Sequence, residues 1–593
     1  QFKIGGGATA GAAALTVAGS GPNTGSNQTE VTNIFTYADQ FQISRGIHSV
    51  KAGVWFERLQ NNEFNLNWGQ AIFPTLQSFL QGAPSQLSLQ INPALLPWRS
   101  WLGAWFVQDS MRLRPSLTLS LGLRHEFTNG WHNEDNAAAN LVPGPDGVLL
   151  TAPVIGNSLF AKNTQRWLFG PRAGVAWDPF GKGRTSIRAG FGMAHNLLDN
   201  IGWCCRSVNP LYSTYVIANP PFPYQQDSAA PFPAGLSVTK GSTGGGGIQP
   251  DAQPSTAVHY RLEIEQGLGA ATSLRLTYTG SHGYHGILRA DSNTAVPVIC
   301  SQERGNCSAA LPPGTKYFPA GAPRRNPQLS SIVQFFTSAV SDYNAGSIDL
   351  NRRFNGGLAF RTNYTYSKSM DNASSLSSLQ AIGNPALVLD PADPMRDYGL
   401  SAFDVRHRFS FSGSYELPFG NGRRFLNGVT GVADQMVSGW QVNLISSAQS
   451  GFPFTPTLGF NWSRDGNTST PDRVSLAPGR RLDSIYLRTP EHWVDPTAFV
   501  LPAAGTYGNA GRNILIGPRL VTVDLSVFKT TRISDRRNLQ FRAEIFNLLN
   551  HTNFGIPSPI MLTNTGAPAA AAGVITSTAT TSRQIQLGMK LIF

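Results

Sequence analysis

The chain has 593 residues, of which 13% are charged and 10% aromatic, and its 46 Lys+Arg against 34 Asp+Glu give a net charge of +12. Soluble domains carry about 25% charged residues, so this composition argues against an ordinary soluble protein, while the lack of any run of about 18 apolar residues argues against a transmembrane helix. The basic residues are scattered rather than gathered in one face or tail, which argues against nucleic acid as a partner. Low charge, many aromatic residues and no apolar helix are typical of a transmembrane β-barrel.

The chain opens on a segment that is predicted to be a loop. Residues 1–30 are rich in Gly, Ala, Ser and Asn and show no periodic pattern, which is the composition of loops. Residue 1 is Gln, and no signal peptide is recognisable. We interpret the segment as the remnant of a loop that belongs to a longer chain.

From there on, apolar and polar residues alternate along nearly the whole sequence. Between Leu117 and Leu123 every second residue is leucine, and Val521 to Val527 follows the same pattern. A period of two places alternate side chains on opposite faces of a strand. The predicted strands are about 32–43, 46–60, 100–112, 115–128, 166–178, 184–197, 254–266, 271–285, 343–354, 357–370, 404–418, 437–450, 517–530, 534–549 and 583–593. The segment Ile332–Phe336 could add a strand, but we expect it to be loop because an extra strand would break the pattern of connections.

The links between these strands alternate in length. Links such as 181–183 and 355–356 are short, whereas every second link is long, at about 61–99, 129–165, 198–253, 286–342, 371–403, 451–516 and 550–582. Short turns on one side and long loops on the other describe an outer-membrane barrel. In a soluble sandwich, loops of this length would count against the strand assignment.

The four cysteines fall in predicted external loops. Cys300 and Cys307 enclose six residues, and a local disulfide fits an oxidising compartment. Cys204 and Cys205 are adjacent and can form a vicinal bridge or pair elsewhere. A zinc site is the weaker interpretation, because no His or Cys partners show ligand spacing.

No catalytic or cofactor motif is present, so we expect the protein not to be an enzyme. The run Gly181-Lys182-Gly183 lacks the spacing of a phosphate loop and lies between two strands, and His125-Glu126 lacks the second His of a zinc protease. Three residues of a polar loop, Asp465, Asn467 and Asp472, could ligate Ca²⁺ through hard oxygens. A solvated, turn-rich loop is the more common explanation for such a cluster.

Charged residues on the polar positions of the strands are predicted to face the lumen: Arg406, Arg408, Asp524, Arg542 and Glu544. They could contact a plug or line a substrate path, while charge pairing between neighbouring strands is the simpler role for most of them. Tryptophans near strand ends are predicted to form aromatic girdles at the membrane interfaces, or to face a ligand in the loops: Trp98, Trp101, Trp105, Trp167 and Trp440.

The last strand, 583–593, reads RQIQLGMKLIF and ends on Phe593. A terminal aromatic residue on an alternating strand resembles the closing strand of bacterial outer-membrane barrels, where the assembly machinery recognises this end. Phe593 is therefore predicted to be the assembly signal, and the machinery and outer-membrane lipid are predicted partners. The alternative is an ordinary last strand of a soluble β-sandwich.

The direction of this strand orients the others. With the long loops outside, it runs toward the periplasm, and counting back fifteen strands makes the first one run the same way. Bacterial single-chain barrels have an even strand number and begin and end on the periplasmic side, so we expect strands to be missing at the N-terminal side, about seven if the parent is a 22-stranded plugged transporter. The predicted domains are an external loop remnant at 1–30 and an incomplete outer-membrane β-barrel with long external loops at 31–593.

Several segments resemble the Oar-like TonB-dependent receptors of Acidobacteria. They are FVQD at 106–109, RLRPSLTL at 112–119, LNRRF at 350–354, NYTYSKSMD at 363–371, DVRHRF at 404–409, SYELPFG at 414–420, GWQ at 439–441 and FRAEIFNLLNHTNF at 541–554. The resemblance spans residues 45 to 593 and implies a 22-stranded barrel plugged by an N-terminal domain. It also implies energised transport through the inner-membrane TonB complex, by way of a plug that no segment of this sequence matches.

The sequence therefore favours two functions, and a third is a weaker possibility. The first is the β-barrel part of a TonB-dependent receptor that moves an unknown substrate across the outer membrane of a Gram-negative bacterium. The alternative is a plugless passive porin or structural outer-membrane barrel of 16 strands, and a secreted β-rich adhesive protein is a third and weaker possibility. A plug and TonB box encoded upstream would favour the first, whereas a signal peptide directly before Gln1 would exclude it.

Overall fold

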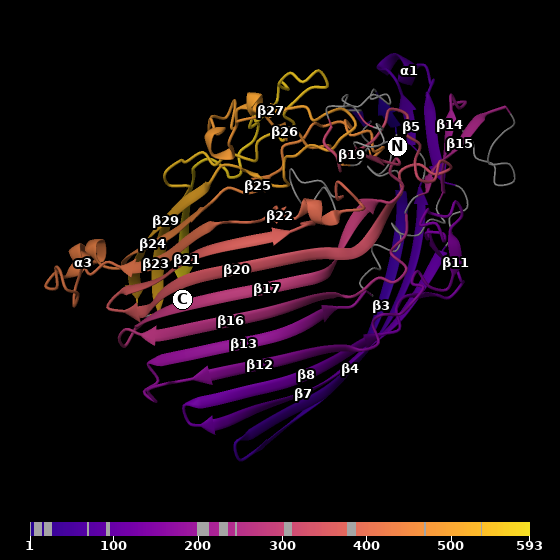
Figure 1. Ribbon diagram of the computed structural model, residues 1–593. Coiled ribbons are helices and arrows are strands. Elements are labelled where there is room, and N and C mark those ends of the chain that lie inside the picture. Colours follow the sequence, from indigo (N-terminus) through magenta and orange to yellow (C-terminus); the bar gives the residue numbers. More distant parts are fainter. Residues whose placement is uncertain are drawn as a thin grey trace.

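The computed structural model describes residues 2–4, 15–16, 26–67, 70–90, 95–198, 213–223, 235–243, 246–301, 307, 311–375, 387–467, 470–534 and 536–593. Antiparallel strands dominate it (Figure 1). Its helices are short, with α1 at Leu76–Leu80 and α3 at Gly431–Val437. None of the helices in these ranges has the length and apolar character needed to cross a membrane.

A 17-stranded sheet forms the body of the molecule. Two of its strands are short, β9 (His132–Asn133) and β22 (Gly399–Leu400), and the others are long strands that pair antiparallel in chain order. All fifteen predicted strands are thereby confirmed. The long strands are β3 (Ser26–Arg45), β4 (His48–Asn67), β7 (Leu95–Arg114), β8 (Leu117–Thr128), β12 (Leu168–Trp177), β13 (Thr185–Asn196), β16 (Ser255–Gly267), β17 (Thr272–Asp291), β20 (Val333–Asn355), β21 (Leu358–Asp371), β23 (His407–Glu416), β24 (Trp440–Gln449), β29 (Leu520–Ser534), β30 (Arg537–Phe546) and β31 (Gln584–Ile592).

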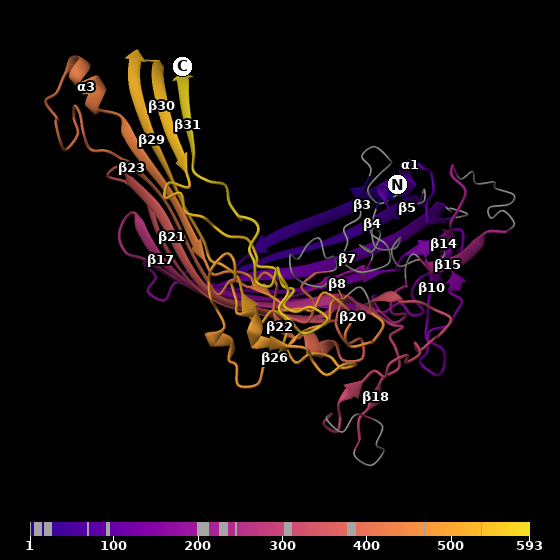
Figure 2. The same cartoon turned by 90° about the horizontal axis from the view of Figure 1, so that it is seen from above.

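The sheet curves into an open trough. Within the described ranges, β3 pairs along its length with β4, and β31 with β30. Figure 2 shows β3 and β31 on opposite sides of the opening. An unpaired strand edge presents a row of free N–H and C=O groups that can template further pairing. The trough is therefore a wall with two edges that can accept further strands.

One end of the wall carries mostly short turns. Gly356 and Gly357 link β20 to β21 with φ values of 63° and 83°, and two consecutive positive φ values are what a type I′ hairpin turn requires. The longest link at this end, residues 417–439, carries α3. The opposite end carries the long links, so the predicted alternation of short and long connections is confirmed.

The long links fold rather than remaining structureless. A 6-stranded sheet beside the wall joins β1 (Phe2–Ile4), β2 (Leu15–Thr16), β5 (Gln70–Phe73), β6 (Gln86–Gln90), β14 (Ser213–Ala218) and β15 (Ser237–Thr243). Two-stranded sheets pair β10 (Ala138–Asn140) with β11 (Val154–Gly156) and β18 (Val298–Ile299) with β19 (Lys316–Tyr317). Because β1, β2 and the start of β3 fall within residues 1–30, that segment is not wholly loop as predicted.

The last two long links pack into one unit, here named the C-terminal loop module (residues 450–519 and 547–583). It contains β25 (Pro453–Phe454), β26 (Ser475–Leu476), β27 (Phe499–Val500) and β28 (Leu515–Ile516). Its hydrophobic core takes residues from both links, including Phe454 and Leu515 from the first and Met561 and Leu562 from the second. The core ties together segments that the sequence pattern treats as separate loops.

Two predictions about the wall are wrong in detail. Residues 333–336 belong to β20, which extends further toward the loops than predicted, so they lengthen a strand and leave the alternation of links intact. Trp98 does not lie at a membrane interface: it is fully buried with Leu59, Leu96 and Trp131 under the loops at the end of β7.

Candidate functional site

The register of the wall separates two faces, here named the polar face and the apolar face. Ser412 of β23 pairs with Arg361 of β21 and with Ile445 of β24, whereas Phe409 pairs with Tyr364 and Ala448. Paired residues of antiparallel strands share a face, and neighbours along a strand take opposite faces. The same parity can be followed from β3 to β31 through each pairing.

The apolar face is covered with large side chains that are exposed. Leu587 of β31 is 78% exposed and Trp105 of β7 is 40% exposed. An exposed apolar band along alternating strands is what a membrane barrel presents to lipid. Exposed members of this face are Phe41, Val54, Trp105, Leu121, Phe169, Phe191, Leu262, Leu276, Ile348, Tyr364, Phe409, Phe541 and Leu587.

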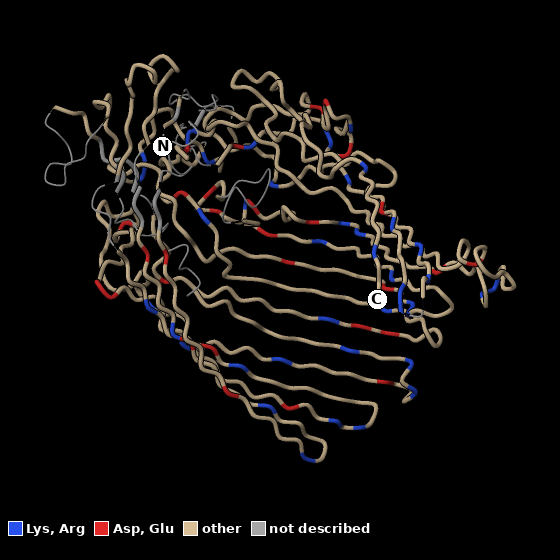
Figure 3. The backbone as a smooth tube through the Cα atoms, turned by 180° about the vertical axis from the view of Figure 1, so that it is seen from behind, with Lys and Arg blue, Asp and Glu red and all other residues tan. Residues whose placement is uncertain are grey.

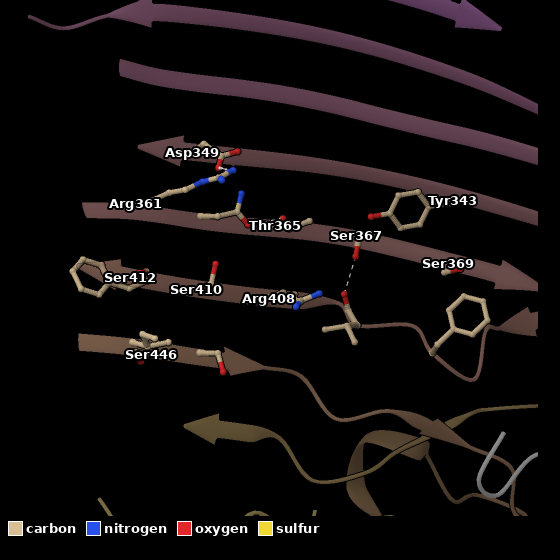
Figure 4. A pocket seen from close by; sticks show the side chains of 16 residues that line it. Tyr343, Asp349, Arg361, Thr365, Ser367, Ser369, Arg408, Ser410, Ser412 and Ser446 are labelled. Carbon is tan, nitrogen blue, oxygen red and sulfur yellow. Dashed lines mark hydrogen bonds and ion pairs between the residues drawn. The ribbon is translucent and has the colours of Figure 1, made fainter. Parts of the chain in front are cut away.

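The polar face holds a cavity of about 710 Å³ over β20, β21, β23 and β24 (Figure 4). Hydroxyl groups dominate its lining on this face: Tyr343, Thr365, Ser367, Ser369, Ser410, Ser412 and Ser447. Hydroxyls both donate and accept hydrogen bonds. This part of the wall can therefore bind water, a polar ligand or a polar protein surface without a fixed charge requirement.

Two arginines add positive charge to this hydroxyl cavity. Arg361 Nη2 lies 3.1 Å from Asp349 Oδ1 on the neighbouring strand. Arg408 also lines the cavity, opposite Thr365 in register, and forms no ion pair within the described ranges. The cavity thus combines one neutralised arginine with one whose charge is available to an anionic group.

A ladder of charges continues the polar face across β13, β16 and β17. Figure 3 shows that basic and acidic residues occur on adjacent strands of the wall. Glu263 is 7% exposed and lies at its centre, with Arg188 Nη1 at 3.2 Å and Arg275 Nε at 3.7 Å. Arg261 contacts the same carboxylate, and Arg275 also reaches Glu265 at 3.2 Å. Sequence reasoning did not single out this ladder, because the register that brings the strands together is not visible in any one strand.

The residues predicted to face the lumen are distributed over this wall. Arg408 lines the hydroxyl cavity. Arg406 precedes β23, 3.7 Å from Asp404 and over the ring of Tyr366.

The other three predicted residues lie nearer to the edge strand β31. Asp524 on β29 is paired in register with Ile445, which lines that cavity. Asp524 accepts a hydrogen bond from the Asn547 backbone N–H at 2.8 Å. Arg542 donates to Gln540 and lies over the ring of Phe528. Glu544 is paired in register with Ser526 and Gln586. The structure therefore does not bring the predicted lumen set together as one site.

The predicted cysteine pair lies at the tip of a long link. Cys300 and Cys307 form a disulfide with their Cα atoms 5.5 Å apart. Cys204 and Cys205 lie outside the described residues. Of the tryptophans, Trp101 and Trp167 are exposed on or beside the apolar face, at 45% and 76%.

The predicted calcium ligands lie in the C-terminal loop module, where Asp465, Asn467 and Asp472 are each 1% exposed. Burial raises the pKa of Asp472 to about 7, and the nearby Asp465 carboxylate adds to the rise against hydrogen bonds from Ser463 and Trp462. Burial also raises the pKa of Asp465. Across the described ranges, no group of three or more His, Cys, Asp or Glu side chains is arranged to hold a metal ion.

The sequence matches the family model described as an outer membrane beta barrel domain over residues 3–586. Among solved structures, the outer membrane transporter YddB from Escherichia coli is similar at a TM-score of 0.50 and 11% identity, covering 95% of this chain and 55% of that chain. The siderophore receptor PiuA from Acinetobacter baumannii has a TM-score of 0.42 at 9% identity, covering 95% of this chain and 56% of that chain. The ferripyoverdine receptor of Pseudomonas aeruginosa has a TM-score of 0.42 at 10% identity, covering 97% of this chain and 51% of that chain. The chain thus spans about half the length of these structures, and no curated protein matches it.

Proposed function

The chain belongs to the outer membrane beta barrel domain family, and from this premise we propose that it forms part of the wall of a TonB-dependent transporter of the outer membrane. In this proposal the apolar face contacts lipid and the polar face lines the interior. Further strands complete the barrel between β3 and β31. A plug inside it couples the transporter to the inner-membrane TonB complex.

The observation that carries the proposal is the contrast between the two faces of one sheet. Large apolar side chains stay exposed on one face, while the other carries a hydroxyl-lined cavity and a ladder of ion pairs. A soluble sandwich would bury one face against a second sheet. Here a single layer leaves both faces open, which suits lipid on one side and a polar interior on the other.

The size of the wall favours a large barrel. The edge strands β3 and β31 lie far apart across the opening (Figure 2), so fifteen long strands with this curvature do not meet. Barrels of about 16–18 strands leave an aqueous channel, and those of about 22 strands enclose a plugged lumen. A wall that is still open after fifteen strands is better matched by the larger class.

In this reading the polar face has two tasks. Its hydroxyls and the Asp349–Arg361 pair hold a polar plug surface, or the water around it, without burying uncompensated charge. Arg408, which has no ion partner in the described part of the chain, offers an attractive contact to an acidic group on a plug or substrate. The passive porin remains the competing function, and it would need no plug against this face.

Conductance separates the two functions. Protein isolated from outer membranes of its native bacterium is inserted into planar lipid bilayers, with an extract from cells lacking the gene as the control. A plugged transporter shows no steady conductance until a denaturant displaces the plug, after which large channels open. Steady open channels in the absence of denaturant would contradict the proposal and favour a passive pore.

A further inference from the structure

The buried aspartates of the described ranges fall into two groups. Five of them have a basic side chain within 4 Å: Asp291 with Arg324, Asp371 with Arg512, Asp390 with Lys316, Asp397 with Arg473 and Asp404 with Arg406. Asp465 and Asp472 are buried just as deeply, at 1% exposure each, and form no such pair. Buried charges in proteins are paired, coordinate metals or are neutralised by protonation, and these two carboxylates lack the cationic partner that the other five have.

Both carboxylates are held by neutral donors, all but Tyr507 from the same loop. Asp465 accepts hydrogen bonds from Asn461 Nδ2 at 2.6 Å, from the Asn467 backbone N–H at 2.8 Å and from the Tyr507 hydroxyl at 3.1 Å. Asp472 accepts from the backbone N–H groups of Trp462 and Ser463 through one oxygen, Oδ2. These bonds fix the orientation of the carboxylates but bring no positive charge.

The second oxygen of Asp472 is the independent sign of a ligand. Asp472 Oδ1 is buried and has no hydrogen-bond partner within the described ranges, and the same is true of Thr470 Oγ1, whose residue is 3% exposed. A buried acceptor without a partner costs about 1–3 kcal/mol, and more when it is charged. Asp472 Oδ1 and Thr470 Oγ1 stand two residues apart in sequence, and the Asp465 carboxylate is near enough to raise the pKa of Asp472. These oxygens are of the kind that ligate a hard cation.

The basic groups in and near this loop do not pair with its two buried carboxylates. Arg464 lies within the loop, has an exposed side chain and forms no ion pair within the described ranges. Arg473 follows Asp472 in sequence, but its guanidinium pairs with Asp397. Arg324 donates to the backbone carbonyls of Asn293 and Gly466 and lies 3.6 Å from Asp291. None of the three comes within 4 Å of the Asp465 or Asp472 carboxylates as an ion pair.

We propose that the C-terminal loop module binds one Ca²⁺ ion through the carboxylates of Asp465 and Asp472 and the hydroxyl of Thr470. The ligand atoms are all oxygens, and hard oxygen ligands in an irregular loop suit Ca²⁺, whereas Zn²⁺ would need His or Cys ligands. Mg²⁺ keeps several waters in a strict octahedron, which a site this buried does not favour. With two carboxylates, the affinity belongs with extracellular modules, with a Kd on the order of 10⁻⁴–10⁻³ M.

Terbium luminescence tests the site directly, because Tb³⁺ takes the place of Ca²⁺ among oxygen ligands. The backbone of Trp462 donates to Asp472, so its indole is placed to sensitise a bound Tb³⁺ ion. The full-length protein in detergent is titrated with Tb³⁺ under tryptophan excitation, and the bound ion is then displaced with Ca²⁺ or with Mg²⁺. We expect one ion per chain, displaced by Ca²⁺ at concentrations at least tenfold below those needed with Mg²⁺.

Three variants locate the ion. D472N and D465N should each weaken binding at least tenfold, whereas D483N should bind as the wild type does, because Asp483 lies in the same module but is exposed at 67% and paired with Arg481. No sensitised luminescence in the wild type, or equal binding by D472N and the wild type, would overturn the proposal. If the two Asn variants do not fold, the wild type is measured alone. Ca²⁺ added to about tenfold above the proposed Kd should raise the midpoint of thermal unfolding of the module relative to the protein in chelator, and an unchanged midpoint would contradict the site.

Discussion

The strand wall and the C-terminal loop module place their apolar and charged side chains in opposite ways. In the wall the large apolar side chains are exposed, as Leu587 is at 78%, whereas in the module they are buried, as Phe454 is at 0%. The charges follow the same division: Arg188, Arg261 and Arg361 of the wall are more than half exposed, while Arg473 and Arg512 of the module are almost fully buried beside aspartates. A wall that meets lipid needs no core of its own, whereas a module that meets water must build one.

The largest expected effect comes from a variant at the contact between the module and the wall, which should unfold one region and leave the other folded. Arg512 of the module donates to Asp371 at the end of β21 and to the Asp397 backbone carbonyl. R512A leaves the Asp371 carboxylate buried without its partner, which we expect to cost about 3–5 kcal/mol. Hydrogen exchange should then show the module unprotected while the strands of the wall keep their protection. R481A, at an 80% exposed side chain, is the control and should change little.

The lipid-facing role of the apolar face predicts a strong asymmetry between the two faces of the wall. L262R places a charge on the apolar face of β16 and should cost about 2–4 kcal/mol if it lies near the bilayer midplane. S410R places the same charge on the polar face of β23 and should be tolerated. Unfolding in urea from lipid vesicles measures both, and equal costs would contradict the assignment of faces.

The ionic ladder gives a smaller effect within the wall. E263Q removes the carboxylate that Arg188, Arg261 and Arg275 share, leaving three like charges close together. We expect a loss of about 1.5–3 kcal/mol, which salt should reduce because the arginines are partly exposed. The double variant R275Q/E263Q should be less affected than the sum of the two single changes.

The smallest expected effect is a pH dependence in the module. Asp495 caps a short helical turn by accepting from Thr497, and although burial raises its pKa, bonds from Thr497 and Arg480 outweigh this and leave it below the usual value. A lowered pKa stabilises the folded module above the unfolded value of about 3.9, and that stability is lost as the pH falls through the folded pKa. D495N should therefore lower stability by up to about 1 kcal/mol at pH 7, and the difference from the wild type should shrink in acid.

The difference between the wall and the module also explains which parts of the fold could be predicted from the sequence. Every long strand of the wall could be found, because a face that meets lipid leaves a period of two in residues such as Leu117 to Leu123. The sequence predicts too late a start for β20. Residues 333–336 do not show the alternation of a lipid-facing strand, although they pair with β17. Trp98 was misplaced for a related reason: loops that fold back over a strand end bury it, and nothing in its strand reveals those loops.

The module could not be predicted, because its core comes from residues far apart in sequence and without a period. Met561 packs with Phe454 and Leu515, yet each stands in a stretch of turns. The sequence marks Asp465, Asn467 and Asp472 as a weak Ca²⁺ candidate, with a solvated loop as the favoured explanation. The burial of the two aspartates, and the lack of a basic partner for them within the described ranges, depend on the tertiary structure. The ladder around Glu263 likewise depends on register between strands, which the alternation within one strand does not specify.

The central claim is that the polar face of the wall lines the barrel interior and the apolar face meets lipid. A spin-label scan of residues 117–124 of β8 in lipid vesicles tests it most directly, with Cys204 and Cys205 replaced by serine. The account predicts a period of two, with Leu117, Leu119, Leu121 and Leu123 accessible to oxygen in the bilayer and the residues between them accessible to a water-soluble nickel complex. A scan without alternation, or leucine positions that contact water as freely as their neighbours, would contradict it.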